Sequence, residues 1–173
     1  MAVWRRLLQA LPEARLLLHA KAGSHRDRVR DFMAQESIAP ERITFVDRVP
    51  TGEYFRIYEQ MDIALDPFPY GGGTTTCDAL WMGVPVVSLA GQTAVGRGGL
   101  SILSNIGLAD LVATNTEEYV HIAESLAGDI TRLSELRATL RERLQKSPLM
   151  DAPRFAQAIE AAYRRMWHCY CGS

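Results

Sequence analysis

The organisation of this chain follows from residues 66–85, whose sequence is Asp66-Pro67-Phe68-Pro69-Tyr70-Gly71-Gly72-Gly73-Thr74-Thr75-Thr76-Cys77-Asp78-Ala79-Leu80-Trp81-Met82-Gly83-Val84-Pro85. The apolar residues 63–65 just before it are typical of a short buried strand, which the two prolines end. Beyond the glycines, the pattern predicts a short helix over 76–82 that stops at a glycine, and then a strand over 84–89. The order is therefore strand, glycine loop, helix and strand.

The loop and the helix start favour the binding of an anion. Three consecutive glycines allow positive φ and let a ligand approach the backbone closely. The hydroxyls of Thr74, Thr75 and Thr76 add donors to a helix N-terminus, where free N–H groups and the positive end of the helix dipole attract phosphate. The alternative is a simple connection, a glycine turn with a threonine N-cap. One glycine and one threonine would suffice for that.

Outward from this stretch, strands and helices alternate. Five apolar runs are typical of the buried strands of a parallel sheet, at residues 14–18, 43–46, 61–65, 85–89 and 111–113. Helical patterns separate them, at residues 25–37, 53–60, 76–82 and 97–105, with others at 4–11 and 116–128. The alternation predicts an α/β fold, a Rossmann-like parallel sheet with helices on both faces. We expect residues 1–128 to form this lobe. Residues 129–173 should add helices that pack on the same lobe, with their apolar stripes in the core.

Composition excludes several classes of protein. The chain has 173 residues, 47% of them hydrophobic, and a net charge of −1, which predicts one globular domain and argues against a nucleic-acid binder. No run reaches the roughly 18 apolar residues of a membrane span, and no signal peptide is visible. The irregular spacing of Cys77, Cys169 and Cys171 predicts neither a disulfide framework nor a zinc site. We expect a cytoplasmic protein without a metal, a resident cofactor, a nucleic-acid partner or a membrane contact.

The glycine loop differs from the two common phosphate-binding motifs. It is neither the G-x-G-x-x-G of dinucleotide-binding folds nor a Walker loop with its Gly-Lys-Ser/Thr, so a dehydrogenase and a P-loop NTPase are disfavoured. No Ser/His/Asp or Cys/His grouping is legible. Asp62 and Asp66 flank the third strand but are too far apart in sequence for a tight metal–diphosphate pair. We therefore assign no catalytic residue in this chain.

The segment 66–85 resembles the C-terminal catalytic lobe of the O-linked N-acetylglucosamine transferases, a lobe that the plant SPINDLY proteins and many bacterial tetratricopeptide-repeat transferases also carry. The resemblance covers nearly the whole chain, through residues 42–45, 61–66, Ala90-Gly91 with Arg97, Glu118-Tyr119, Ser147-Pro148 and 163–167. It implies the second lobe of a GT-B glycosyltransferase that is metal-independent and inverting. It also implies that the parent protein has an N-terminal lobe and tetratricopeptide repeats, and that this piece alone transfers no sugar.

Carried over position by position, the resemblance implies a set of binding residues. The diphosphate is assigned to Gly73, Thr74, Thr75 and Thr76, the ribose to Asp78, the base to Arg48, Val49, Thr51 and Tyr54, and the surroundings of the sugar to Tyr70 and Gly72. A metal has no place in this set, because helix N–H groups and hydroxyls would neutralise the leaving diphosphate.

The resemblance leaves the donor open between UDP-N-acetylglucosamine and GDP-fucose. The animal enzymes have histidine, lysine and histidine where this sequence has Tyr54, Thr51 and Gly73. Phe68-Pro69-Tyr70 followed by three threonines is closer to SPINDLY, which transfers fucose, and to the bacterial proteins. We expect N-acetylglucosamine transfer from UDP-N-acetylglucosamine to Ser or Thr of a protein or peptide. The alternatives are O-fucosyl transfer from GDP-fucose, a nucleotide-sugar epimerase and a non-catalytic interaction module.

Overall fold

The computed structural model describes residues 1–172. They contain eight α-helices, namely α1 (Ala2–Ala10), α2 (Ser24–Ala34), α3 (Thr51–Ile57), α4 (Thr74–Trp81), α5 (Gly98–Asn105), α6 (Thr116–Gly128), α7 (Ile130–Gln145) and α8 (Ala152–Cys171). Their strands are β1 (Leu16–His19), β2 (Ile43–Val46), β3 (Ala64–Leu65), β4 (Val86–Leu89) and β5 (Val112–Ala113). Short 3₁₀ turns are η1 (Pro40–Arg42), η2 (Tyr58–Gln60), η3 (Val95–Arg97), η4 (Ala109–Leu111) and η5 (Pro148–Met150).

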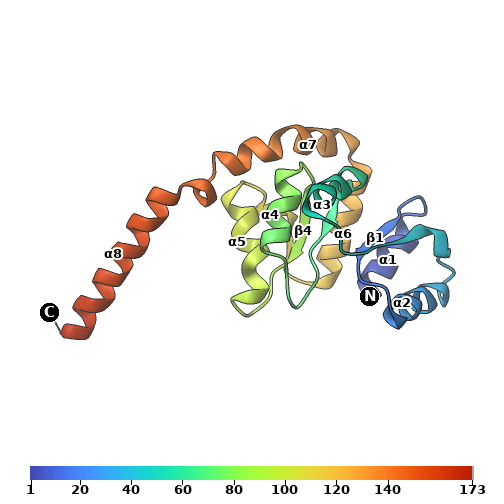
Figure 1. Cartoon of the computed structure of the whole chain (residues 1–173), viewed down its shortest axis with the longest axis horizontal. Coiled ribbons are helices and arrows are strands. Elements are labelled where there is room, and N and C mark those ends of the chain that lie inside the picture. Colours follow the sequence, from blue (N-terminus) through green and yellow to red (C-terminus); the bar gives the residue numbers. More distant parts are fainter. Residues whose placement is uncertain (173) are drawn as a thin grey trace.

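Strands and helices alternate, and all the strand pairs are parallel (Figure 1). β1 pairs with β2, from Leu16 opposite Ile43 to His19 opposite Val46. In the second sheet β4 lies between β3 and β5. The prediction of an α/β fold with parallel strands and flanking helices is confirmed. The expectation of a single sheet is wrong for residues 1–172, because β1 and β3 do not pair and the strands divide into two sheets.

The main hydrophobic core surrounds β4. This strand is paired on both edges, and α4, α5 and α6 pack against it, so Val86 and Val87 are buried. Leu80 from α4 and Tyr119 from α6 are buried in the same core. A smaller core lies beside the β1–β2 sheet and is made by Leu8, Met33, Ile38 and Ile43. The carboxyl end of β3 and the start of α4 thus rest on the best-buried part of the molecule.

β1 is less buried than its sequence predicts. An apolar run over 14–18 is typical of a strand enclosed on both faces, but β1 runs from Leu16 to His19 and its three leucines are only half-buried. The reason is that β1 is paired on one edge only. Its other edge borders an open cleft.

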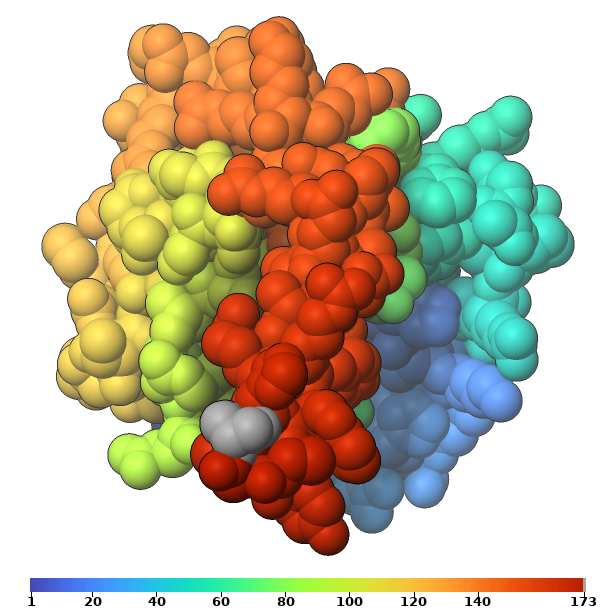
Figure 2. All heavy atoms as spheres, turned by 90° about the vertical axis from the view of Figure 1, so that its left-hand side faces the viewer, coloured from blue at the N-terminus to red at the C-terminus, as the bar shows by residue number. Residues whose placement is uncertain are grey.

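The C-terminal helices behave differently from each other. α7 packs against α4 and α6, as expected for residues 129–173. α8 projects away from the rest of the molecule (Figure 1) and lies in front of the other elements when the molecule is viewed from that side (Figure 2). None of its side chains is buried. Four large residues of its apolar stripe, which was expected in the core, are therefore exposed: Phe155, Ile159, Tyr163 and Met166. Trp167 and Tyr170 of the same helix are exposed as well. The expectation that both helices pack on the lobe is wrong for α8, while the boundary at residue 128 stays a prediction.

None of the helices in residues 1–172 is both long enough and apolar enough to cross a bilayer.

Candidate functional site

A buried carboxylate organises the loop between β3 and α4. Asp66 follows β3 directly and is only 5% exposed. Its Oδ1 accepts hydrogen bonds from the Gly72 N–H and from Thr76 Oγ1, both at 3.0 Å, and its Oδ2 accepts one from Ser88 Oγ at 2.9 Å. Tyr119 Oη donates to the Asp66 carbonyl oxygen at 3.0 Å. Several donors thus satisfy a carboxylate that forms no ion pair within residues 1–172.

Two glycines make room for this carboxylate. A Cβ atom on Gly72 would lie 2.5 Å from Thr76 Oγ1 and 2.8 Å from Asp66 Oδ1. A Cβ atom on Gly99 would lie 2.0 Å from Ser88 Oγ. Any side chain at either position would therefore push apart the groups that hydrogen-bond Asp66. Gly72, which the family resemblance assigns to the surroundings of the sugar, has this structural reason for lacking a side chain.

The predicted diphosphate residues form the start of α4. The helix begins at Thr74, two residues earlier than the sequence predicts, and its N-cap is Gly73, which offers no capping side chain. The first bond of the helix runs from the Cys77 N–H to the Gly73 carbonyl oxygen. The N–H groups of the three threonines precede this bond, so they are the donors that a helix leaves without an internal partner.

The side chains of the three threonines have different surroundings. Thr74 and Thr75 are exposed, whereas Thr76 is 2% exposed and its hydroxyl donates to Asp66. Two hydroxyls and the N–H groups of the first turn are therefore open to a ligand, while the third hydroxyl holds the loop. The first turn contains no acidic residue that would repel an anion.

Asp78 and Tyr54, predicted to bind the ribose and the base, lie in one hydrogen-bonded cluster. Tyr54 Oη donates to Asp78 Oδ2 at 3.0 Å and lies 2.6 Å from Tyr58 Oη. Tyr58 Oη in turn reaches the Thr75 carbonyl oxygen at 3.5 Å. Burial, followed by the hydrogen bonds to Tyr58 and Asp78, raises the pKa of Tyr54 far above its usual value. Tyr54 therefore stays protonated and keeps donating, which joins α3 to α4.

The other predicted base-binding residues lie in the segment that leads into α3. Arg48 and Val49 belong to the loop after β2, and Thr51 is the first residue of α3 and is exposed. Within residues 1–172, no hydrogen bond or ion pair connects these three residues to the glycine loop. Tyr70, predicted beside the sugar, is 73% exposed at the tip of that loop. The structure therefore brings Tyr54 to Asp78 and leaves Tyr70 open to solvent.

A second helix start lies against the glycine loop and is absent from the predicted set. α5 begins with Gly98-Gly99 and has Arg97 at its N-cap. A Cβ atom on Gly98 would lie 3.4 Å from the Gly72 carbonyl oxygen, so the two loops touch. Arg97 is exposed and its guanidinium donates to the Gly91 carbonyl oxygen at 3.3 Å. The glycine pair after a buried strand, preceded by a cation, is the signal that could have identified it.

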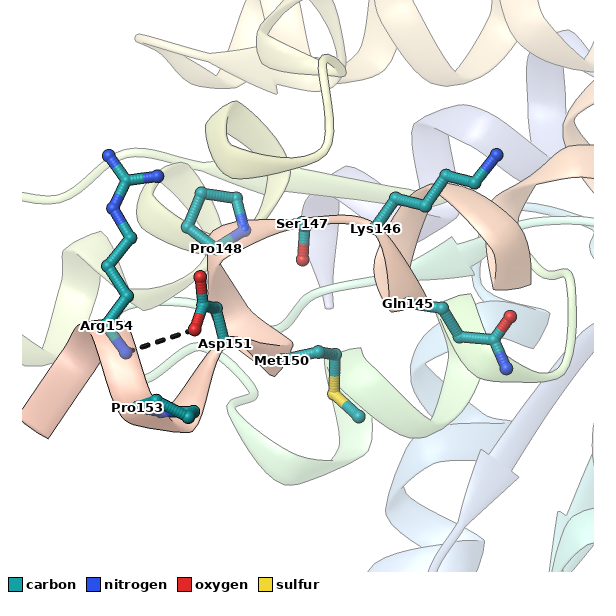
Figure 3. Close-up of a pocket in the computed structure, with 8 residues that line it drawn as sticks. All are labelled: Gln145, Lys146, Ser147, Pro148, Met150, Asp151, Pro153 and Arg154. Atoms are coloured by element: carbon teal, nitrogen blue, oxygen red, sulfur yellow. Dashed lines mark hydrogen bonds between the residues drawn. The ribbon is translucent and has the colours of Figure 1, made fainter.

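Two further features bear on other kinds of site. Within residues 1–172, no group of three metal-ligating side chains could hold a metal ion. A hollow of about 360 Å³ lies where α7 meets α8 (Figure 3), and residues 145–154 alone line it. Its polar groups cap helices: the Arg154 N–H donates to Asp151 Oδ1 at 3.0 Å, and the Leu149 N–H donates to Ser147 Oγ at 3.3 Å. This hollow contains none of the predicted binding residues.

The chain is similar to known proteins over nearly its whole length. Residues 1–159 match the model of a family described as glycosyl transferase family 41. The chain is 43% identical to a probable UDP-N-acetylglucosamine–peptide N-acetylglucosaminyltransferase SPINDLY from Petunia hybrida, over 98% of this chain and 19% of that protein. It is 30% identical to the corresponding SEC protein of Arabidopsis thaliana, over 97% of this chain and 17% of that protein.

A solved structure shows the same architecture. A mutant O-GlcNAc transferase from Thermobaculum terrenum superposes with a TM-score of 0.89 at 39% identity, covering 98% of this chain and 33% of that chain. The chain thus spans about a fifth of the length of the curated relatives it matches and a third of this solved relative.

Proposed function

Since this chain belongs to glycosyl transferase family 41, we propose that it is the nucleotide-sugar-binding lobe of an enzyme that transfers N-acetylglucosamine from UDP-N-acetylglucosamine to Ser or Thr hydroxyls of proteins. The observation that carries the proposal is the start of α4. There the N–H groups of the first turn and two threonine hydroxyls are open beside a loop fixed by a buried carboxylate. The names of the relatives, which are probable peptide N-acetylglucosaminyltransferases, support the choice of sugar and acceptor.

The proposed chemistry is a displacement at the anomeric carbon. The acceptor hydroxyl oxygen forms the new C–O bond with inversion, while the bond to the diphosphate breaks and its electron pair goes to the leaving phosphate oxygen. The hydroxyl proton passes to a base that we do not assign to this chain. The α4 N-terminus with Thr74 and Thr75 stabilises the charge that develops on the diphosphate, which replaces a metal ion. Arg97 is an exposed cation at the neighbouring helix start and can add to this stabilisation.

The other binding roles in the proposal are those that the family resemblance implies. Asp78 accepts the ribose hydroxyls, and its position is set by the hydrogen bond from Tyr54. Arg48, Val49 and Thr51 at the start of α3 contact the base. Tyr70 is close to the sugar at the open tip of the loop. Thr76 acts through Asp66 to position the loop, because its hydroxyl is already engaged.

The test is calorimetric titration of the full-length protein with UDP and GDP in EDTA. UDP binding without metal is the expected result. Asp78→Ala should weaken it by about 1–3 kcal/mol, roughly 5–150-fold, because hydrogen bonds to a charged group are lost. Asp62→Ala is the matched control, since Asp62 is an exposed carboxylate just before β3 and has no assigned binding role. Unchanged affinity in Asp78→Ala would remove Asp78 from the site.

GDP-fucose is the second candidate donor, and the same titration tests it. The chain is more similar to the SPINDLY relatives than to SEC, and residues 68–76 resemble the SPINDLY pattern, for which fucose is the implied sugar. Binding of GDP but not UDP would replace the proposed donor by GDP-fucose. Binding of neither nucleotide by the full-length protein would favour a non-catalytic module. Release of free epimerised nucleotide-sugar instead of a glycosylated acceptor would identify an epimerase.

A further inference from the structure

Tyr58 is a buried tyrosine to which the proposed function gives no role. It follows α3 directly, as the first residue of η2, and is only 7% exposed. Tyr54 lies four residues earlier, one helical turn away, so the two side chains share a face. Their rings meet edge to face, with centroids 5.4 Å apart and planes at 89°. The Tyr58 ring belongs to the main hydrophobic core, where its hydroxyl needs a hydrogen-bond partner.

The hydrogen bonds of the two tyrosines have a definite direction. Tyr54 Oη lies 3.0 Å from Asp78 Oδ2 and 2.6 Å from Tyr58 Oη. A tyrosine hydroxyl has one proton to donate, and a carboxylate only accepts. Tyr54 therefore donates to Asp78 and accepts from Tyr58. The Thr75 carbonyl oxygen, the other acceptor near Tyr58 Oη, is farther away at 3.5 Å. The three side chains thus form a chain of donors that ends on Asp78.

This chain engages one oxygen of the Asp78 carboxylate. Within residues 1–172, the hydrogen bond from Tyr54 to Oδ2 is the only one that the Asp78 side chain accepts, and Asp78 forms no ion pair there. The terminal torsion of an aspartate is otherwise broad. Holding Oδ2 therefore also sets the direction of Oδ1, the oxygen that is left to accept from a ligand.

Tyr58 determines how firmly this carboxylate is held. A hydroxyl that accepts a hydrogen bond is polarised and becomes a stronger donor, so the bond from Tyr58 strengthens the bond from Tyr54 to Asp78. Tyr54 is only half-buried, whereas the Tyr58 ring is enclosed by the core. The buried tyrosine is thus the fixed end of the chain, and Asp78 is the end that faces a ligand.

We propose that Tyr58 is a positioning residue for the nucleoside, which through the Tyr54 hydroxyl holds the Asp78 carboxylate with its free oxygen directed at the ribose. The inference rests on the proposed function, which assigns the ribose hydroxyls to Asp78. Tyr58 itself touches no ligand. It therefore controls the part of the affinity that comes from the ribose and not the part that comes from the diphosphate.

Calorimetric titration of the full-length protein with two ligands tests this division. The first is the nucleotide that the parent protein binds, UDP or GDP. The second is its 2′,3′-dideoxy analogue, which keeps the base and the diphosphate but lacks the hydroxyls that would reach Asp78. Tyr58→Phe removes one hydroxyl and keeps the ring in the core. We expect it to weaken binding of the ribonucleotide about threefold to tenfold, and to change binding of the dideoxy analogue by less than about twofold.

Two results for Tyr58→Phe would overturn the inference. An unchanged affinity for the ribonucleotide would show that Tyr58 does not position Asp78. An equal loss of affinity for both ligands would show a general effect on the lobe, which is what a merely structural role predicts. Tyr163→Phe is the matched control, because it removes a hydroxyl from the exposed helix α8. It should bind both ligands as the parent does.

A double variant tests the route through Tyr54. Because Tyr58 acts on Asp78 only through the Tyr54 hydroxyl, its own hydroxyl should matter little once that group is gone. Tyr54→Phe/Tyr58→Phe should therefore bind the ribonucleotide within about twofold of Tyr54→Phe alone. Losses that multiply would contradict the chain and indicate another route, such as the Thr75 carbonyl group.

The parent protein separates a failure of this inference from a failure of the proposed function. If the parent binds neither UDP nor GDP, the nucleotide-binding role is wrong and the inference falls with it. If the parent binds the ribonucleotide no better than the dideoxy analogue, the ribose role of Asp78 is wrong, which also overturns the inference. If the parent prefers the ribonucleotide and Tyr58→Phe keeps the whole preference, the role of Tyr58 alone is overturned.

Discussion

Two strand–helix–strand units of this molecule share a topology but differ in what holds the loop after the first strand. In β1–α2–β2 the loop is held by a cation: the Arg26 guanidinium donates to the carbonyl oxygens of Ala20 and Lys21 and lies 3.4 Å from Asp47. In β3–α4–β4 it is held by an anion, the buried carboxylate of Asp66. The first loop is exposed and the second rests on the main core.

The difference explains why only one of the two loops suits a phosphate. A cation that binds carbonyl oxygens does nothing to orient N–H groups, and α2 carries Asp27 in its first turn, which disfavours an anion there. The Asp66 carboxylate turns the Gly72 N–H and one hydroxyl inward. The donors of the α4 first turn remain outward, with no acidic residue among them. Units of equal topology therefore differ in how well their loops suit an anion, because the charge at the centre of each loop is opposite.

The largest expected effect comes from removing that anion. Asp66→Ala leaves the Gly72 N–H and the Thr76 and Ser88 hydroxyls without their acceptor in a buried place. We expect it to lower the free energy of unfolding by about 4 kcal/mol. Urea denaturation of the full-length protein measures this loss. Asp62→Ala, at an exposed position before the same strand, should change stability by less than about 0.5 kcal/mol. A loss below about 1 kcal/mol in Asp66→Ala would show that the hydrogen bonds to Asp66 do not hold the loop.

This centre could not be predicted from sequence, although most of the surrounding elements could. The apolar run before Asp66, the glycines and the threonines are local signals, and they correctly place a strand, a loop and a helix. The role of Asp66 depends on Ser88 and Tyr119, which lie 22 and 53 residues away. Nothing in a local pattern shows that these groups meet. For the same reason the sequence does not show the separate role of Thr76. Its hydroxyl looks equivalent to those of Thr74 and Thr75 until its partner, Asp66, is known.

Periodicity has a related limit, seen in β1 and α8. An apolar stripe shows which residues share a face, but not what covers that face. The stripe of α7 is covered by α4 and α6, and that of α8 is exposed, although both have helical spacing. The leucines of β1 are likewise half-buried, since one of its edges has no neighbouring strand. The covering partner is a non-local property that a sequence pattern does not contain.

The second prediction compares burial in the two units directly. Leu80 of α4 is fully buried, so Leu80→Ala removes a well-packed side chain and leaves a cavity. A loss of about 3 kcal/mol is expected. Leu17→Ala, at a half-buried position beside the cleft, should cost at most about 1 kcal/mol in the 173-residue chain.

Both values come from urea denaturation followed by far-UV circular dichroism. A loss in Leu17→Ala as large as the loss in Leu80→Ala would show that the two units are buried to the same degree.

The smallest expected effect concerns the tyrosine that joins the two units through α3. Burial, and then the hydrogen bonds to Tyr58 and Asp78, raise the pKa of Tyr54 in the folded protein above the ordinary tyrosine value. In the unfolded chain the same hydroxyl has its ordinary pKa of about 10. The unfolded state therefore releases the proton first as the pH rises. The stabilisation is fully present below about pH 10 and is lost above it.

Tyr54→Phe should accordingly lower the free energy of unfolding by about 1 kcal/mol at pH 8, because one hydrogen bond to a charged group is lost. Between pH 9 and pH 11 the stability of the parent protein should fall more steeply than that of the variant. In this range the unfolded parent chain releases the Tyr54 proton, whereas the variant has no hydroxyl at this position. Tyr70→Phe is the matched control: Tyr70 is 73% exposed, so neither the value at pH 8 nor the slope should change. Parallel pH curves for the parent protein and Tyr54→Phe would show that the Tyr54–Asp78 bond does not hold α3 against α4, and that the proposed base-binding and ribose-binding residues are positioned independently.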